Sequence, residues 1–339
     1  MGQRVLVTGI SGWIAQFCAA ELLKQGYHVK GSLRSTYREE EVKKALAPFI
    51  SEASQLSFCE LDLCKDNGWN EEMKGCDYVL HVASPYVMKE PKDSNELISP
   101  AKEGTLRALK AAQKAGVKRV VLTSSVAAMC AHMKQGQFSE STWTDLSSNQ
   151  PNIYQRSKTI AEKAAWDFYN NQEGDHKIEL VVINPGAVMG PTLSEDLDGV
   201  SLGFCAGLIS GKLPGIPNVN FVMVDVRDVA NHHVQAMTLP EANGKRFVSA
   251  HAQPQSFLAI AQMLNQQGYK KVPTKKVPDF IIKFMSLFDR EAKSMAKFLN
   301  LTVSCDNSQT IKLFNWNPIP IETTIADMGK TVQSFLSKT

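Results

Sequence analysis

The sequence predicts an α/β protein with a doubly wound parallel sheet and a smaller C-terminal lobe. Three observations lead to this prediction. Short β-branched runs alternate with helix-length segments, a glycine-rich turn follows the first run, and the alternation weakens after Pro191. Such alternation is typical of parallel strands joined by crossover helices.

Seven short apolar runs are the expected strands. They cover residues 4–8, 28–33, 56–61, 78–82, 119–124, 179–184 and 246–249. Helical patterns lie between them, notably at residues 13–25, 96–115 and 154–170, and the first two end next to Gly26 and Gly116. Seven strands connected in this way suit a doubly wound sheet with helices on both faces.

Two lobes are expected. Residues 1–190, with a return segment at about 225–250, would form the sheet domain, and residues 191–224 and 251–339 would form the smaller lobe. The glycines and prolines of "ISGKLPGIPN" mark the change of pattern. Because no flexible linker separates the lobes, we expect a rigid cleft between them, where small ligands commonly bind.

Composition limits the classes of function. The chain has 339 residues, 43% of them hydrophobic, and a formal charge of +3 from 37 basic and 34 acidic residues. This balance gives no general reason to expect nucleic acid or an anionic membrane as partner, so any basic site must be local. The seven scattered cysteines predict reduced thiols and no metal site. Since no apolar run has the length of a membrane span, we expect a cytoplasmic protein that acts on a small molecule as a monomer or homodimer.

The segment "VLVTGISGWIAQF" joins the first expected strand to the first expected helix. Gly9 permits a tight turn, Gly12 lets the backbone approach a pyrophosphate, and Ala15 lets the helix pack close to the sheet. Unpaired N–H groups at the helix N-terminus would bind the phosphates. This context predicts a Rossmann dinucleotide site. Its other members in the same turn are Ser11, Trp13 and Ile14.

The end of the second strand favours NADP(H) over NAD(H). The segment "HVKGSLRSTYREEEVKK" has no acidic residue through Ser35 to bind ribose hydroxyls, and it offers Arg34 instead. A guanidinium can pair with the extra phosphate of NADP, and Lys43 or Lys44 from the next helix can reach the same dianion. Solvated surface charge is the alternative interpretation for Arg38 and both lysines.

The segment "NIYQRSKTIAEKAAW" places Tyr154 and Lys158 four residues apart, on one face of an expected helix. A phenol with a pKa of about 10 is a poor acid at neutral pH, and a neighbouring ammonium lowers that pKa. The pair alone is a weak signal, because such spacing also occurs by chance. It gains weight from "RVVLTSS", whose Ser124 and Ser125 end a strand where ligands of such sheets bind. Strand alternation lets only one of these serines face the cleft and hold a carbonyl oxygen.

Taken together, the motifs resemble those of extended short-chain dehydrogenases/reductases, near the dihydroflavonol reductases, cinnamoyl-CoA reductases and microbial aldehyde or ketone reductases. The matching pieces span nearly the whole chain and include "VTGISGWIA", "VLHVASPY", "KRVVLTSSVAA", "NIYQRSKTIAEKAAW" and "VINPGAVMGP". The resemblance implies hydride transfer from NADPH to an aldehyde or ketone. It also implies that Ser125, Tyr154 and Lys158 are catalytic, with Tyr154 as proton donor.

The resemblance implies further contacts. Those with the cofactor are Asp62 and Leu63 near the adenine, Val82, Ala83, Ser84 and Thr105 along the pyrophosphate and ribose, Thr123, and Pro185, Gly186 and Val188 at the nicotinamide. The expected substrate pocket is lined by Ser84, Tyr86, Cys130, Met133 and Met223, together with Phe204 and Leu208. This apolar set suits aryl or medium-sized aliphatic carbonyls. Ordinary core packing is the alternative for the last two.

Two departures bear on the substrate. Cys130 stands where plant dihydroflavonol reductases carry asparagine or aspartate, and "NIYQR" replaces the Asn-Trp-Tyr-Cys-Tyr pattern of cinnamoyl-CoA reductases. We therefore expect a general aldehyde or ketone reductase. Two alternatives stay open. A nucleotide-sugar epimerase or dehydratase would use the same tyrosine and lysine but usually NAD, which Arg34 does not favour, and a non-catalytic NADP-binding redox sensor would not need the Tyr154–Lys158 pair.

Overall fold

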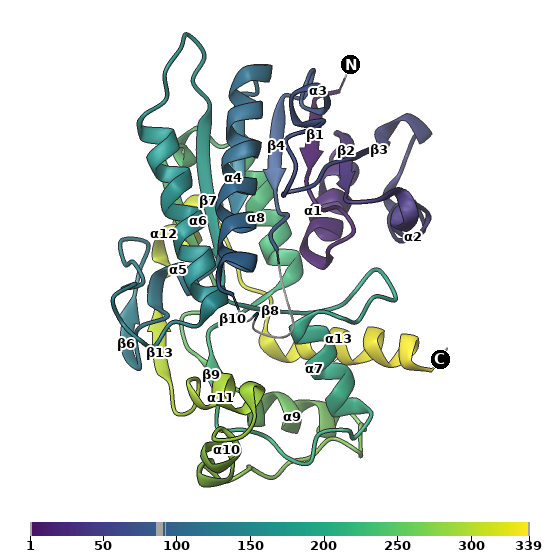
Figure 1. Ribbon diagram of the computed structural model, residues 1–339. Coiled ribbons are helices and arrows are strands. Elements are labelled where there is room, and N and C mark those ends of the chain that lie inside the picture. The colour runs from purple at the N-terminus through teal and green to yellow at the C-terminus, as the bar shows by residue number, and fades with distance from the viewer. Residues whose placement is uncertain (1, 86–90, 92, 338–339) are drawn as a thin grey trace.

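The computed structural model describes residues 2–85, 91 and 93–337, and its centre is one parallel sheet (Figure 1). The strands of this sheet are β1 (Arg4–Val7), β2 (His28–Leu33), β3 (Leu56–Glu60), β4 (Tyr78–His81), β5 (Arg119–Thr123), β7 (Glu179–Pro185) and β11 (Lys245–Ser249). Each lies within one residue of the predicted bounds. Their spatial order is β3-β2-β1-β4-β5-β7-β11, so the order reverses between β1 and β4. The predicted doubly wound Rossmann sheet is confirmed, and this reversal is where such folds bind ligands.

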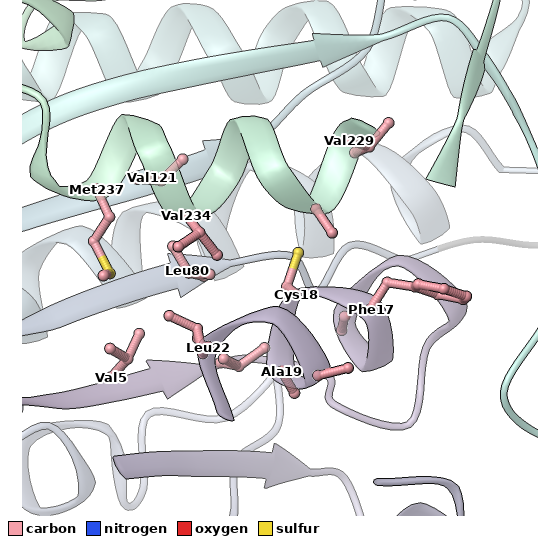
Figure 2. Packing of buried hydrophobic residues seen from close by; sticks show 14 of the residues in the cluster. Val5, Phe17, Cys18, Ala19, Leu22, Leu80, Val121, Val229, Val234 and Met237 are labelled. Atoms are coloured by element: carbon pink, nitrogen blue, oxygen red, sulfur yellow. The ribbon is translucent and has the colours of Figure 1, made fainter. Parts of the chain in front are cut away.

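Helices cover both faces of the sheet. They are α1 (Trp13–Lys24), α4 (Asn95–Ala115), α6 (Ile153–Asn170) and α8 (Val226–Thr238). α1 and α8 pack together on one face, and α4 and α6 pack together on the other. Figure 2 shows the first of these layers, where Leu22 of α1 and Val234 of α8 meet Leu80 of β4. Coverage on both faces explains why β4 and β5 are buried along their whole length.

Short elements connect this framework. They are α2 (Glu39–Leu46), α3 (Trp69–Glu72), α5 (Ala127–Cys130), β6 (Gln135–Phe138), β8 (Ala187–Met189) and β10 (Met223–Asp225). β8 and β10 pair in parallel directly after β7, and β6 pairs with β13 (Thr302–Cys305). The pairing of β6 with β13 joins segments far apart in the chain and was not among the predicted strands.

A second apolar core holds the smaller lobe together. The elements of this lobe are α7 (Val200–Ile209), β9 (Asn220–Phe221), β12 (Gln255–Ser256), α9 (Phe257–Gln266), α10 (Asp279–Met285), α11 (Arg290–Ala296) and α13 (Ile321–Leu336). α13 packs on α7 and α9, so the C-terminal helix closes this core (Figure 1).

The C-terminal part of the chain also contributes to the sheet domain. Phe314 of α12 (Ser308–Phe314) packs with Phe247 of β11, their ring centroids 4.7 Å apart, and Trp316 joins the same core. The division of the chain at residue 190 stays a prediction. Within the described part of the chain, no helix combines the length and apolarity needed to cross a membrane.

Candidate active site

The turn from β1 into α1 leaves the first amides of α1 without a side-chain cap. Gly12 is the N-cap residue, and the first helical turn contains no acidic residue. Gly9 has φ of +66°, and a Cβ there would lie 3.0 Å from the Cβ of Ala83, so the ends of β1 and β4 approach closely. Unpaired amides at the start of a twelve-residue helix form a site that fits a pyrophosphate.

Thr8 and His81 hold the β4 side of this turn. The Thr8 Oγ1 accepts a hydrogen bond from the Ala83 N–H at 3.0 Å and lies 2.9 Å from His81 Nδ1. Burial lowers the pKa of His81 to about 3, and the nearby Lys158 charge acts in the same direction. His81 is therefore neutral at physiological pH and serves to fix the loop that carries Ala83.

Two of the four cations near the end of β2 already have partners. Arg38 Nη2 lies 2.7 Å from the carboxylates of Glu41 and Asp196, which links this loop to the segment after β8. Lys43 Nζ lies 2.9 Å from each of two glutamates on its own helix. These carboxylates raise the pKa of both cations. Neither cation is therefore free to meet a phosphate without losing existing bonds.

Arg34 and Lys44 are the remaining two cations. Both are exposed, and neither forms an ion pair with any residue that the structure describes. Arg34 directly follows β2, next to the β1 strand that leads into the glycine turn. These positions fit an additional phosphate on the adenosine side of a dinucleotide, and they favour Lys44 over Lys43 as the second contact.

A capping box fixes the start of α6. The Asn152 Oδ1 accepts the Gln155 N–H at 2.9 Å, and the Gln155 Oε1 accepts the Asn152 N–H at 2.9 Å. The helix therefore begins at Ile153, which puts Tyr154 in its first turn and Lys158 one turn later on the same face. Tyr154 is half-buried, as a side chain at the rim of a cleft would be.

Lys158 is buried at the carboxyl edge of the sheet. Its side-chain amine donates to the Thr123 carbonyl oxygen at 3.4 Å. Burial lowers the pKa of Lys158 to about 8, and the negative charge of Glu162 opposes that shift. The residues around the same small hollow are Ala83, Ser84, Thr105, Leu122, Thr123, Ser124, Ala161 and Glu162. Four predicted cofactor contacts, Ala83, Ser84, Thr105 and Thr123, thus lie together with Lys158.

The two serines after β5 point to different surroundings. The Ser124 hydroxyl is buried and donates to the Glu162 carboxylate at 2.5 Å. Ser125 is half-buried, and its Oγ accepts the Ala127 N–H at 3.1 Å, which leaves its own proton for another acceptor. This divergence is the one that strand alternation predicts. It leaves Ser125 as the candidate to meet a substrate oxygen.

A buried polar cluster behind the serines was not predicted. Glu162 accepts hydrogen bonds from Asn184 Nδ2 and Arg246 Nε, each at 2.7 Å. Asn184 Nδ2 also donates to the Ser125 carbonyl oxygen at 3.1 Å, and the Arg246 guanidinium lies 3.7 Å from the Trp143 ring centre. The sequence signal that could have indicated this cluster is Glu162 itself, an acidic residue four positions after Lys158 and therefore on the same helix face.

The other predicted cofactor contacts follow the ends of their strands. Asp62 and Leu63 come just after β3, where the Leu63 carbonyl accepts Arg107 Nη1 at 2.7 Å. Pro185 ends β7, and Val188 lies in β8. A Cβ on Gly186 would lie 2.4 Å from the Val222 carbonyl oxygen, so this position requires glycine. All of these positions belong to the carboxyl edge of the sheet, although their contacts with a cofactor stay predictions.

The predicted substrate contacts are less uniform. Met223 is fully buried in the core of the smaller lobe, and Cys130 donates through its Sγ to the Val126 carbonyl at 3.3 Å. Met133 is half-buried and packs in the same small cluster as Cys130. Tyr86 lies outside the described residues. Of this set, Ser84 is the one that lines the hollow at Lys158.

Comparison with known proteins agrees with this geometry. The sequence model of the NAD dependent epimerase/dehydratase family matches residues 5–250. Cinnamoyl-CoA reductase CAD2 of Medicago truncatula is 35% identical over 252 residues, which is 72% of this chain and 75% of the relative. An anthocyanidin reductase of Vitis vinifera is 31% identical over 289 residues, 80% and 82% of the two chains.

Solved structures give the same result. The NADPH complex of the yeast methylglyoxal/isovaleraldehyde reductase Gre2 superposes with a TM-score of 0.82 at 28% identity, over 99% of this chain and all of that one. Gre2 of Candida albicans, also with NADPH, has a TM-score of 0.79 at 23% identity. The second likeness shows the fold alone, and the first covers both lobes.

Proposed function

This chain belongs to the NAD dependent epimerase/dehydratase family, among the extended short-chain dehydrogenases/reductases that resemble dihydroflavonol reductases, and we propose that it reduces an aldehyde or ketone to an alcohol with NADPH. The observation that carries the proposal is the buried ammonium of Lys158, one helical turn after Tyr154 and at the same sheet edge as the uncapped glycine turn. A desolvated cation on the same helix face as a tyrosine supports a catalytic site, because side chains with strongly perturbed pKa values concentrate at such sites.

The glycine turn and β2 would hold the cofactor. The amides of Trp13 and Ile14 at the start of α1 would bind the pyrophosphate, and Arg34 and Lys44 would bind the additional phosphate. Thr105, Ala83 and the Lys158 amine would lie along the ribose. When bound, NADPH supplies the hydride that reduces the carbonyl carbon. The absence of an acidic side chain at the end of β2 separates this proposal from an NAD-dependent epimerase.

Three side chains would handle the carbonyl oxygen. The Ser125 hydroxyl donates to it and holds it in place as negative charge develops. Tyr154 gives it a proton, and the Lys158 ammonium favours the phenolate that remains. Asn184 of β7 helps to position the Ser125 backbone, because its side-chain amide donates to the Ser125 carbonyl oxygen.

The names of two relatives support a carbonyl substrate, since one is a cinnamoyl-CoA reductase and the other a methylglyoxal/isovaleraldehyde reductase. We place the reaction in the cytoplasm, because all seven cysteines are free thiols and NADPH-driven reduction suits a reducing compartment.

A spectrophotometric assay tests the proposal. The oxidation of NADPH and of NADH is followed with aldehydes, ketones, ketoesters and dihydroflavonols. We expect turnover with NADPH on at least one of the first three classes and a higher kcat/KM than with NADH. No turnover on any class, or a preference for NADH, would overturn the proposal and favour the sensor or the epimerase.

The tyrosine variant tests the chemistry. Tyr154→Phe should lower kcat by at least about 1,000-fold while NADPH affinity, measured by titration calorimetry, stays within a few fold. Tyr169→Phe is the matched control, because Tyr169 lies on the same helix and its hydroxyl bonds Asn243 at 3.3 Å, away from the hollow. Substantial turnover by Tyr154→Phe would refute its role as proton donor.

A further inference from the structure

Residues 270–297, here called the basic tip, form the outer end of the smaller lobe and contain α10 and α11 (Figure 1). Large apolar side chains of the basic tip face outward. Phe280 is 71% exposed, Phe284 63%, Leu287 72% and Phe288 80%. Phe284 and Phe288 contact each other edge to face, with ring centroids 5.5 Å apart, so they form one continuous apolar surface. A monomeric domain rarely leaves several such side chains together in water.

The inner side of α10 is already packed. Ile282 is 8% exposed and joins Val219 and Leu299 in a small apolar cluster with Val277 at its edge. The outward phenylalanines are therefore additional to the contacts that hold the helix on the lobe. A helix that is apolar on both sides, with one side open to solvent, needs a second apolar partner.

Positive charge is concentrated in the same segment. The basic tip contains eight basic and three acidic residues, whereas the other 311 residues contain 29 basic and 31 acidic ones. The exposed lysines of the tip are Lys270, Lys271, Lys275, Lys276, Lys283 and Lys293. None of them forms an ion pair with a described residue. The balanced charge of the whole chain therefore hides a strongly cationic region of 28 residues.

Exposed aromatic and aliphatic side chains in the same segment as several exposed lysines match the surface of an anionic bilayer. Apolar groups enter the boundary between headgroups and acyl chains, while lysines meet the lipid phosphates and carboxylates. A second copy of the chain is a poorer match. A twofold interface would place the same patch against itself, and the lysines of one tip would face those of the other.

We propose that the basic tip is a peripheral membrane-binding surface, with Phe280, Phe284, Leu287 and Phe288 inserted among anionic lipids. A peripheral contact of this kind does not require a membrane-crossing helix, and the described part of the chain contains none. The overall charge balance gave no general reason to expect an anionic membrane as partner, but it allowed a local basic site, and the basic tip is such a site. The proposal concerns where the enzyme resides, and its test does not depend on turnover.

Vesicle flotation with the full-length protein tests it. The probes are vesicles of phosphatidylcholine alone and of phosphatidylcholine mixed with phosphatidylserine. We expect binding to the mixed vesicles only, and release at high salt because the lysine contribution is screened. Equal binding to both vesicle types, or binding to neither, would overturn the proposal.

Two variants separate the apolar and the charged contributions. Phe284→Ser/Phe288→Ser should lose binding, and Lys275→Glu/Lys276→Glu should weaken it by more than the about fivefold expected for each lysine lost. The matched control is Lys110→Glu/Lys114→Glu on α4, two exposed lysines that should leave binding unchanged. Equal loss in the control would reduce the effect to net charge and refute a defined surface.

Two further results would also refute the proposal. One is a concentration-dependent dimer in sedimentation velocity that Phe284→Ser/Phe288→Ser abolishes, because the partner would then be a second copy. The other is a raised KM of that variant for a carbonyl substrate without vesicles, because the segment would then cover the active site. Unchanged thermal melting of both tip variants shows that lost binding does not come from unfolding.

Discussion

The Ser124 hydroxyl donates a 2.5 Å hydrogen bond to the Glu162 carboxylate and so ties the end of β5 to the helix that carries Tyr154 and Lys158. Glu162 is fully buried and also accepts bonds from β7 and β11 through Asn184 and Arg246. One carboxylate thus sets the position of α6 relative to three strands. It also places a negative charge one turn from Lys158.

Glu162→Gln should destabilise the fold by about 3 kcal/mol, because it leaves the buried Arg246 charge without its counter-ion. Urea denaturation measures the free energy of unfolding. Glu40→Gln is the control, since Glu40 is 85% exposed in its pair with Lys43 and should change stability by less than about 0.5 kcal/mol. Similar losses in both variants would show that burial of the pair is unimportant.

The two serines should separate activity from stability. Ser125→Ala is expected to lower kcat by about 100-fold with little change in Tm, because it removes a donor to the reacting oxygen. Ser124→Ala is expected to lower stability by about 2 kcal/mol, because Glu162 loses a donor, with a much smaller change in kcat. The NADPH-oxidation assay measures kcat and a thermal melt measures stability for both variants. A large loss of kcat in Ser124→Ala, with little loss in Ser125→Ala, would transfer the catalytic role to Ser124.

Activity should fall as pH rises through the pKa of Lys158, about 8 in the free enzyme. Glu162 faces this amine from its own helix, and His81 faces it from β4 as a neutral ring. Because kcat/KM reports the free enzyme, its value for NADPH should drop about tenfold per pH unit above that point. In Glu162→Gln the drop should begin at lower pH. A flat profile to high pH would show that the Lys158 charge is not required.

Stability should change in the opposite direction. Burial lowers the pKa of Lys158 from its ordinary value of 10.5, so the unfolded chain binds the extra proton between about pH 8 and that value. The free energy of unfolding of the cofactor-free protein should therefore rise with pH across this window. Urea denaturation of the wild type against Lys158→Met isolates this effect, and parallel curves would contradict it.

The preference for NADPH should depend on Arg34 and Lys44. Arg34→Ala should reduce the ratio of kcat/KM for NADPH to that for NADH by about 10- to 100-fold, because a charge-assisted phosphate contact is lost. Lys44→Ala should have a smaller effect in the same direction. Lys43→Ala is the control, since its amine is already held by Glu39 and Glu40. A change in Lys43→Ala as large as in Lys44→Ala would reverse the assignment.

The sheet and the ends of its strands could be predicted because their signals are local. Strand-length runs between helical patterns identified all seven strands to within one residue, and the end of the fifth run drew attention to Ser124 and Ser125. Glu162 and Arg246 are 84 positions apart, and neither has a neighbour in sequence that indicates a buried ion pair. The pairing of β6 with β13 could not be predicted from local sequence either, since the two strands lie more than 160 residues apart.

The capping box at Asn152 and Gln155 has a consequence for how this enzyme can diversify. Because the helix start is set by the N-cap residue Asn152 and by Gln155 of the first turn, the preceding loop does not by itself determine where the phenol of Tyr154 lies. Part of that loop is fixed for another reason, since Trp143 stacks on Arg246 and Thr144 donates to the Ala127 carbonyl oxygen. The exposed side chains of Ser147 and Asn149 are not part of these contacts, so libraries randomised at these two positions should leave the catalytic helix unchanged.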